Sequence, residues 1–203
     1  MSVDLGYTIQ GRGGQAFCWL DNTGGVPWSA LANYNFSLLP NATDNWAATT
    51  TGSFLLSTPF TVTSGQQLTV IADVISAHDF PYYDVGFALL VNGSQVQEIL
   101  FAMRPDGIGH IFDIGPIPQN SFASPSAGVT VTPVKNGAAN VVLGGAAYGP
   151  PTGSFDGGVS TKVTAVCTPG AGVFQLIFGM FTTNGLPDIA KPAALIVQSV
   201  FVM

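Results

Sequence analysis

The chain has 203 residues and a formal net charge of −6, and only 8% of its residues are charged, where about 25% is usual for globular proteins. Its five basic residues are scattered, which argues against a nucleic-acid interface, because such an interface needs clustered lysine and arginine. Glycine (25) and proline (14) are abundant, as in chains of strands joined by many turns. We therefore expect a single all-β domain over residues 1–203, with residues 1–52 as an N-terminal strand and loop extension packed on or beside it.

The sequence predicts neither a secretion signal nor insertion into a membrane. The first residues contain Asp4 and no apolar core of signal-peptide length. The longest apolar run, residues 193–203, is broken by Gln198 and is much shorter than the roughly 18 residues of a membrane span. Cys18 and Cys167 are too few for a disulfide framework and lack metal-ligand spacing. Two buried free thiols are favoured over one long-range disulfide, and both readings stay open.

The strands expected in the N-terminal part are short. Residues 3–9 and 15–20 flank a glycine turn at 11–14, where a positive φ is easily reached. Residues 21–28 read as a loop, and residues 34–39 form a third strand candidate before Pro40.

The regular part of the fold begins with residues 54–62, in which Pro59 predicts a bulge or a sheet edge. Residues 67–76 alternate, so that Leu68, Val70, Ala72 and Val74 share one face and Asp73 lies on the other. We expect this strand to pair with residues 84–91. Asn92-Gly93 then predicts a two-residue hairpin turn.

Residues 104–126 are rich in proline and glycine and too long for an ordinary connection, so they are expected to be functional or docked on something. Short strands are predicted at 128–133, 139–144 and 159–166. No amphipathic period of 3.6 residues lasts three turns. The fold class is therefore all-β, a two-sheet antiparallel sandwich of jelly-roll type with no substantial helix.

The last two strands, residues 172–182 and 192–202, are predicted to form a terminal hairpin with large side chains on both faces. In the first of them Phe174 and Phe178 lie on one face, and Ile177 and Phe181 lie on the other. Both faces must be covered, either by earlier strands or by another molecule. We assign Phe181 to the second face as a candidate contact for assembly.

Four segments in this region carry a family resemblance. They are Gly65-Gln66-Gln67-Leu68, Tyr83-Asp84-Val85-Gly86-Phe87-Ala88-Leu89, Leu176-Ile177-Phe178-Gly179-Met180 and Ala194-Leu195-Ile196-Val197. From Ser57 onward their order and spacing resemble exported β-sandwich domains of bacterial proteins that carry PEP-CTERM sorting tails. The sequence shows no such tail, and Gln198 stands where the family's last strand usually has an acidic residue. The resemblance thus implies a fold and no activity.

The densest polar cluster is His78-Asp79-Phe80-Pro81-Tyr82-Tyr83-Asp84. Asp79 and Asp84, with a backbone carbonyl, are the candidate ligands for calcium, which takes six to eight oxygens. The simpler interpretation, which we favour, is a loop between strands whose aspartates cap turns. No cofactor is otherwise expected.

Catalytic signals are weak, and we expect no enzyme. His78 and His110 are the only histidines, and no Gly-x-Ser-x-Gly elbow occurs. The one glutamate, Glu98, lies within a predicted strand, which does not suit the paired carboxylates of a glycosidase. Carbohydrate binding on an aromatic platform stays open, although the three tryptophans need not converge.

A structural role explains more of the sequence, because assembly interfaces are depleted in lysine and glutamate. We expect a homo-oligomer or part of a larger assembly, most simply a virion surface component such as a capsid decoration or tail-associated protein. The alternative is an extracellular filament, surface-layer or carbohydrate-binding domain. Besides Phe181, the expected contact residues are Tyr82, Tyr83, Ile108 and Phe112.

Overall fold

The computed structural model describes residues 7–10, 13–14, 19–21, 26–31, 33–34, 51–76, 84–103, 126–138, 159–182 and 193–203. Within them lie thirteen strands and one four-residue 3-10 helix, η1 (Trp28–Leu31). The strands are β1 (Tyr7–Gln10), β2 (Gly13–Gly14), β3 (Trp19–Asp21), β4 (Val26–Pro27), β5 (Thr51–Ser57), β6 (Phe60–Val62), β7 (Leu68–Ser76), β8 (Asp84–Asn92), β9 (Gln95–Met103), β10 (Thr130–Ala138), β11 (Val159–Cys167), β12 (Gly172–Thr182) and β13 (Ala193–Val202). The prediction of an all-β chain without a substantial helix is confirmed for this part of the molecule.

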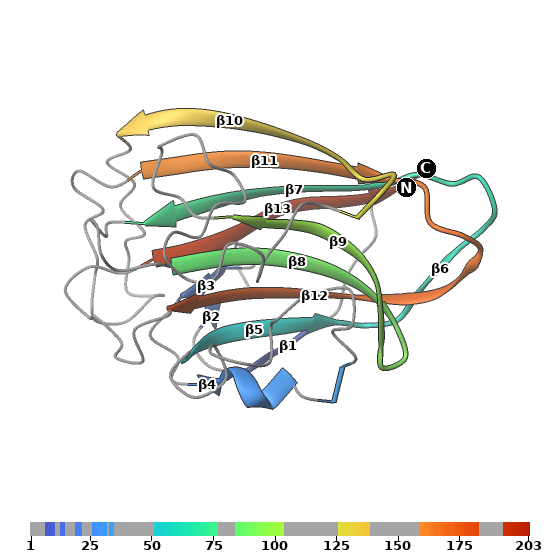
Figure 1. Ribbon diagram of the computed structural model, residues 1–203, viewed down its shortest axis with the longest axis horizontal. Helices are drawn as coiled ribbons and strands as arrows, with labels where there is room; N and C mark the ends of the chain where they lie inside the picture. Colours follow the sequence, from blue (N-terminus) through green and yellow to red (C-terminus); the bar gives the residue numbers. More distant parts are fainter. Residues whose placement is uncertain are drawn as a thin grey trace.

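The strands form two antiparallel sheets that face each other (Figure 1). The seven-stranded sheet has the order β1-β5-β12-β8-β9, with β4 beside β5 and β6 beside β12. The six-stranded sheet has the order β10-β11-β7-β13-β3-β2. From β6 onward the chain crosses repeatedly from one sheet to the other, as in jelly-roll sandwiches. The predicted two-sheet antiparallel sandwich is therefore confirmed.

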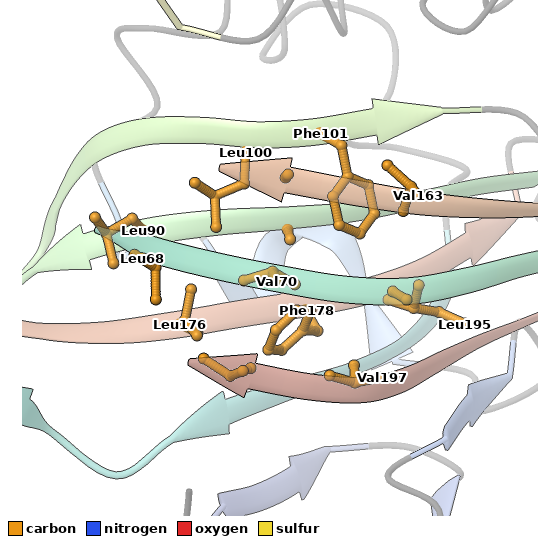
Figure 2. Close-up of a cluster of buried hydrophobic side chains, with 14 of the residues drawn as sticks. Leu68, Val70, Leu90, Leu100, Phe101, Val163, Leu176, Phe178, Leu195 and Val197 are labelled. Atoms are coloured by element: carbon orange, nitrogen blue, oxygen red, sulfur yellow. The ribbon is translucent and has the colours of Figure 1, made fainter. Parts of the chain in front are cut away.

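The main core fills the space between the sheets and is built from the inward face of each strand. Figure 2 shows Leu68 and Val70 of β7 packed among side chains of both sheets, including Leu90, Phe101 and Phe178. The predicted alternation of β7 is confirmed, since Leu68, Val70, Ala72 and Val74 are buried in this cluster and Asp73 lies outside it. Burying apolar surface of this kind stabilises a fold by roughly 25 cal/mol per Å².

A second apolar cluster lies on the outer face of the seven-stranded sheet. The members that the structure describes within the sheet are Phe54, Val85, Phe87, Leu89, Val91, Val96, Ile99, Ala102, Ile177 and Phe181. From outside the sheet come Leu31 of η1, which is fully buried, and Tyr34, which packs against the cluster. The expectation that both faces of β12 are covered is therefore confirmed for Ile177 and Phe181 on the outer face, and the N-terminal part of the same chain contributes to that cover.

Two predicted strand pairings are wrong. β7 pairs with β11 and β13, whereas β8 belongs to the other sheet and pairs with β12 and β9. Likewise β12 and β13 lie in different sheets and form no hairpin. Each of these successive strands carries an apolar face, and the strands bury those faces against each other across the core. β7 and β8 approach closely there: a Cβ added to Gly86 of β8 would lie 2.8 Å from the Val74 side chain of β7.

Smaller corrections concern the strand ends. β10 continues to Ala138, with a shift in its register against β11 between Lys135 and Ala138, where a strand ending at residue 133 was predicted. The predicted strand 139–144 lies outside the described residues. Within the predicted loop 21–28, Val26–Pro27 pair with β5 and Trp28 opens η1. Of the predicted strand 15–20 the structure describes only Trp19 and Leu20, both in β3, and residues 35–39 lie outside the described part.

The bulge predicted at Pro59 is present. β5 and β6 both run along β12, and Thr58 and Pro59 interrupt them. Because this interruption breaks the backbone ladder, the buried Ser57 supplies the missing acceptor: the Leu176 N–H donates to Ser57 Oγ at 2.8 Å. The Gln175 amide donates to the Ser57 carbonyl, also at 2.8 Å.

The two ends of the sandwich differ in how the strands are joined. At one end, which we call the turn end, the connections are the tight turns 63–67, 93–94 and 168–171, together with residues 126–129 that lead into β10. At the opposite end, which we call the loop end, β7, β10 and β12 finish and β8, β11 and β13 begin (Figure 1). Here Ser76 pairs with Val159 and Ala193, and Thr182 pairs with Asp84.

Candidate functional site

Most of the site residues predicted from sequence belong to connections that leave from the loop end. Asp79, Tyr82 and Tyr83 follow the last residue of β7, and Ile108 and Phe112 follow the last residue of β9. All five lie outside the described residues, so their predicted roles are not tested here. Asp84 is described as the first residue of β8, opposite Thr182 of β12. The predicted calcium site therefore stays a prediction.

Phe181 is placed in the interior, which corrects the expectation of an exposed contact. Its side chain is 0% exposed, and its ring stacks on Phe87 with a centroid distance of 5.8 Å and an interplanar angle of 26°. The assignment to the second face of β12 was correct. That face is closed within the chain, since Phe181 belongs to the cluster that contains Leu31.

The outer face of the six-stranded sheet is partly exposed along the described strands β11, β7 and β13. Its side chains alternate with those of the core along β11, β7 and β13. They are mostly threonines and aliphatic or aromatic residues: Thr69, Ile71, Asp73, Lys162, Thr164, Val166, Ile196, Gln198, Ser199 and Phe201. The register places Lys162, Asp73 and Ile196 in one row across the three strands. On this face of β11, β7 and β13, the described charged side chains are one acidic and one basic residue, Asp73 and Lys162, which stand opposite each other.

Asp73 interacts with two polar side chains on this face, Gln198 and Lys162. The side-chain amide of Gln198 on β13 donates to Asp73 Oδ2, and Lys162 lies in register on β11. Oδ1 is buried and has no hydrogen-bond partner in the described structure. Burial raises the pKa of the Asp73 carboxyl above its ordinary value, and the Gln198 hydrogen bond and the Lys162 charge oppose that rise.

A second polar group closes the side of the sandwich between β9 and β11. Ser126 bonds to the edge strand β9 twice: its N–H donates to the Ile99 carbonyl at 3.1 Å, and its Oγ accepts from the Ile99 N–H at 2.8 Å. The Ser126 hydroxyl also bonds to the Glu98 carboxylate, which lowers the Glu98 pKa against the larger rise caused by burial. Ser126 thereby satisfies backbone groups of β9, which is an edge strand among the described residues.

Cys167, at the end of β11, is a buried thiol whose pKa is affected by the charge of Glu98. It is a free cysteine, as the favoured reading of the sequence predicted. Burial and the nearby Glu98 charge raise its pKa to about 11. A thiolate is the reactive form of cysteine, so the thiol of Cys167 is protonated and unreactive at neutral pH.

These polar groups are suited to holding strands together. Among the described residues no group of three or more His, Cys, Asp or Glu side chains is placed to hold a metal ion. In the described part of the chain no helix has the length and apolar character needed to cross a membrane. The polar side chains that the structure describes at these two places make hydrogen bonds between strands or to a strand edge.

Sequence reasoning missed both polar groups. Glu98 was recognised only as a strand residue, because nothing in the sequence pairs it with Ser126, which lies beyond the long segment 104–125. The partnership of Asp73 with Gln198 depends on β7 and β13 being neighbours, and it is reached through the register shift between Val197 and Ser199. The available signal was the single acidic residue in the alternating strand 67–76, which implied a polar partner on the outer face.

No protein-family model matches the sequence, and searches of the curated proteins and of the solved structures gave no significant match. The resemblance to the exported sandwich domains of PEP-CTERM-tailed proteins stays a prediction.

Proposed function

We propose that this protein is a non-enzymatic structural protein that works through contacts between subunits, as a virion surface component of the capsid-decoration or tail-associated kind. The observation that carries the proposal is the shortage of charge, 8% of residues. A soluble monomer of this size ordinarily has a surface that is about 25–35% charged, whereas surfaces buried in assemblies are depleted in charged residues.

The structure changes which surfaces support this proposal. At Ile177 and Phe181 the second face of β12 is covered within the chain and gives no support, because both side chains are fully buried. Support comes instead from the outer face of the six-stranded sheet, where Ile71, Val166 and Phe201 keep partial exposure around the Asp73 and Lys162 pair. An apolar and nearly uncharged sheet face is typical of a surface that meets another protein.

The test is the mass of the purified protein, measured by light scattering across micromolar concentrations. We expect a closed oligomer or a filament whose mass grows with concentration. A chain that stays monomeric and monodisperse at every concentration would overturn self-assembly as its function.

One observation favours the alternative of a carbohydrate-binding sandwich domain. Four long connections, 77–83, 104–125, 139–158 and 183–192, leave described strand ends at the loop end. Binding residues are frequently carried on loops that a rigid scaffold positions. A glycan array probed with the monomer tests this alternative: binding to a defined sugar would favour it over assembly.

A further inference from the structure

The outer face of the six-stranded sheet carries its described charges at one place. β10, β11, β7 and β13 lie side by side in this sheet (Figure 1), and their register arranges the outward side chains in rows. One row holds Lys162 of β11 beside Asp73 of β7. The two rows nearer the turn end hold threonine, serine and apolar side chains, exposed on β10 and partly exposed on the other strands: Thr132, Thr164, Ile71 and Ser199, and then Thr130, Val166, Thr69 and Phe201.

The Lys162 and Asp73 pair is incompletely bonded within the chain. The Gln198 amide donates to Asp73 Oδ2, whereas the buried Oδ1 has no hydrogen-bond partner in the described structure. Lys162 acts on Asp73 through its charge, and the described residues include no hydrogen-bond or ion-pair partner for its ammonium group. That group has three N–H donors, so it remains able to bind an acidic group from outside the chain.

The order of the two charges selects a second copy of this chain as the partner. A purely acidic surface would be attracted by Lys162 and repelled by Asp73, and a purely basic surface would meet the reverse. A matching surface has to present the two charges in the opposite order, at the spacing of neighbouring strands, about 4.7–4.9 Å. The same face of a second copy does so when it is related by a two-fold axis that runs along the strands between β11 and β7. Each Lys162 then faces Asp73 of the other copy.

The same axis matches the uncharged rows. It lays β11 over β7 of the other copy and β13 over β10, so that four strands of each sheet meet four of the other. Val166 then faces Thr69 of the other copy, and Phe201 faces Thr130. Stacked sheets pack about 10 Å apart with their strand directions nearly aligned, and a two-fold axis along the strands keeps that alignment.

We propose that two copies of the chain stack through the outer faces of their six-stranded sheets about this two-fold axis. The inference rests on the proposed function, because it names the partner and the surface by which the protein assembles. In a two-fold contact both copies use the same patch. Association lowers the Asp73 pKa, because the second lysine favours the ionised carboxylate. The effect of burial on this carboxyl therefore belongs to the dilute, monomeric chain.

The experiment exchanges the charges of the pair in the full chain and measures dimer dissociation by sedimentation at several concentrations. Asp73→Lys and Lys162→Asp are each expected to weaken the dimer at least about tenfold, because like charges then face each other across the contact. An equal mixture of the two variants is expected to regain association, since one copy carries two lysines and the other two aspartates. The double variant, Asp73→Lys with Lys162→Asp, is also expected to associate, because reversing the order in both copies preserves the match.

The control is Thr61→Lys on β6, whose side chain is exposed on the seven-stranded sheet. It adds positive charge away from the proposed contact and is expected to leave the dissociation constant unchanged. Circular dichroism of each variant checks that it is folded. A folded single variant that dissociates and is rescued by the mixture is the result that supports the inference.

The failures are distinguishable. If the wild-type chain is monomeric at every concentration, the proposed function fails, and this inference fails with it. If the wild type associates and both single variants behave like Thr61→Lys, assembly stands and this face is not its surface. If the single variants dissociate but neither the mixture nor the double variant recovers, the two-fold pairing of Lys162 with Asp73 is wrong.

Discussion

β12 runs the length of the sandwich, and the two ends of its outer face have opposite environments. Val173, at the turn end, is 55% exposed, whereas Phe181, on the same face near the loop end, is 0% exposed and stacked on Phe87. The residue types would not reveal this difference, because both are large apolar side chains with the same strand parity. What differs is the cover, which includes Leu31 in the cluster around Phe181.

This contrast shows that an apolar strand face is not by itself an interface. Most apolar side chains on the outer face of the seven-stranded sheet belong to a second internal cluster. Val173, on the same face at the turn end, stays exposed. Evidence for assembly therefore has to come from side chains that the chain itself leaves uncovered.

The largest expected effect comes from placing the same charge at each end of β12. Phe181→Asp removes a fully buried ring, which by itself costs about 3–5 kcal/mol, and adds an unpaired buried charge. Since domains of this kind have total stabilities of about 5–15 kcal/mol, we expect this variant to unfold or to lose most of its thermal stability. Val173→Asp, its matched control, should change the stability of the monomer by less than about 0.5 kcal/mol. Thermal melts of both proteins check the difference, and equal melting temperatures would contradict the burial contrast.

The next largest loss of stability is expected at Gly52, which lies against the backbone of β12. A Cβ at Gly52 of β5 would lie 2.1 Å from the Met180 carbonyl oxygen and 2.7 Å from the Phe181 Cα of β12. Because backbone atoms cannot move aside without breaking the ladder, Gly52→Ala is expected to reach or exceed the upper end of the usual overpacking cost of about 1–3 kcal/mol. Gly65→Ala at the turn end meets no atom and bears only its positive φ, about 1–2 kcal/mol. Urea denaturation of the two variants gives the ranking, which a larger loss for Gly65→Ala would reverse.

A smaller effect is expected at the bulge near the turn end. Ser57→Ala removes the acceptor of the Leu176 N–H. A buried donor left without a partner costs about 1–3 kcal/mol. Ser57→Thr keeps the hydroxyl and is the natural comparison, although its extra methyl must fit a buried position. Amide hydrogen exchange at Leu176 provides a local readout: it should speed up in Ser57→Ala, and unchanged protection would show that another group accepts this bond.

Sequence reasoning succeeded where a strand's own residues decide its structure. The bounds of β12 were predicted to the residue, β13 to within one residue, and the Pro59 interruption and the Asn92-Gly93 turn were both found. These features follow from alternation, from the missing N–H of proline and from the positive φ of glycine, 57° at Gly93.

The strand pairings could not be predicted in the same way. Two successive strands with apolar side chains can either pair side by side in one sheet or pack face to face from opposite sheets, and both arrangements bury those side chains. Residues 67–76 and 84–91 fit a hairpin on pattern alone, and the choice of opposite sheets depends on the whole strand order. The same applies to Phe181, which is buried in a cluster that includes Leu31, far away in the chain. The candidate site was predicted least well, because its residues come together only in the folded chain. Gln198, for example, bonds to Asp73 from a strand far away in the sequence.

The smallest expected effect is electrostatic and lies between the two ends, at Asp73. Burial raises the pKa of this carboxyl above its ordinary 3.8, so the folded state favours the protonated form more than the unfolded state does. The cost of ionising Asp73 is therefore absent below pH 3.8 and grows as the pH rises through the folded pKa. Asp73→Asn removes that cost. The variant should match the wild type in stability at low pH and exceed it at neutral pH, by less than about 1 kcal/mol because the group is partly exposed and screened by solvent.

Melting temperatures of wild type and Asp73→Asn at several pH values measure this difference, and Gln198→Leu sharpens it. The Gln198 amide stabilises the ionised carboxylate of Asp73, so its loss should raise the Asp73 pKa further and make the pH dependence of the wild-type aspartate steeper. A carboxyl carbon NMR titration of Asp73 reads the pKa directly. If Asp73→Asn differs from the wild type by the same amount at every pH, its effect arises from packing, and the raised pKa would then have no influence on the stability of the sheet.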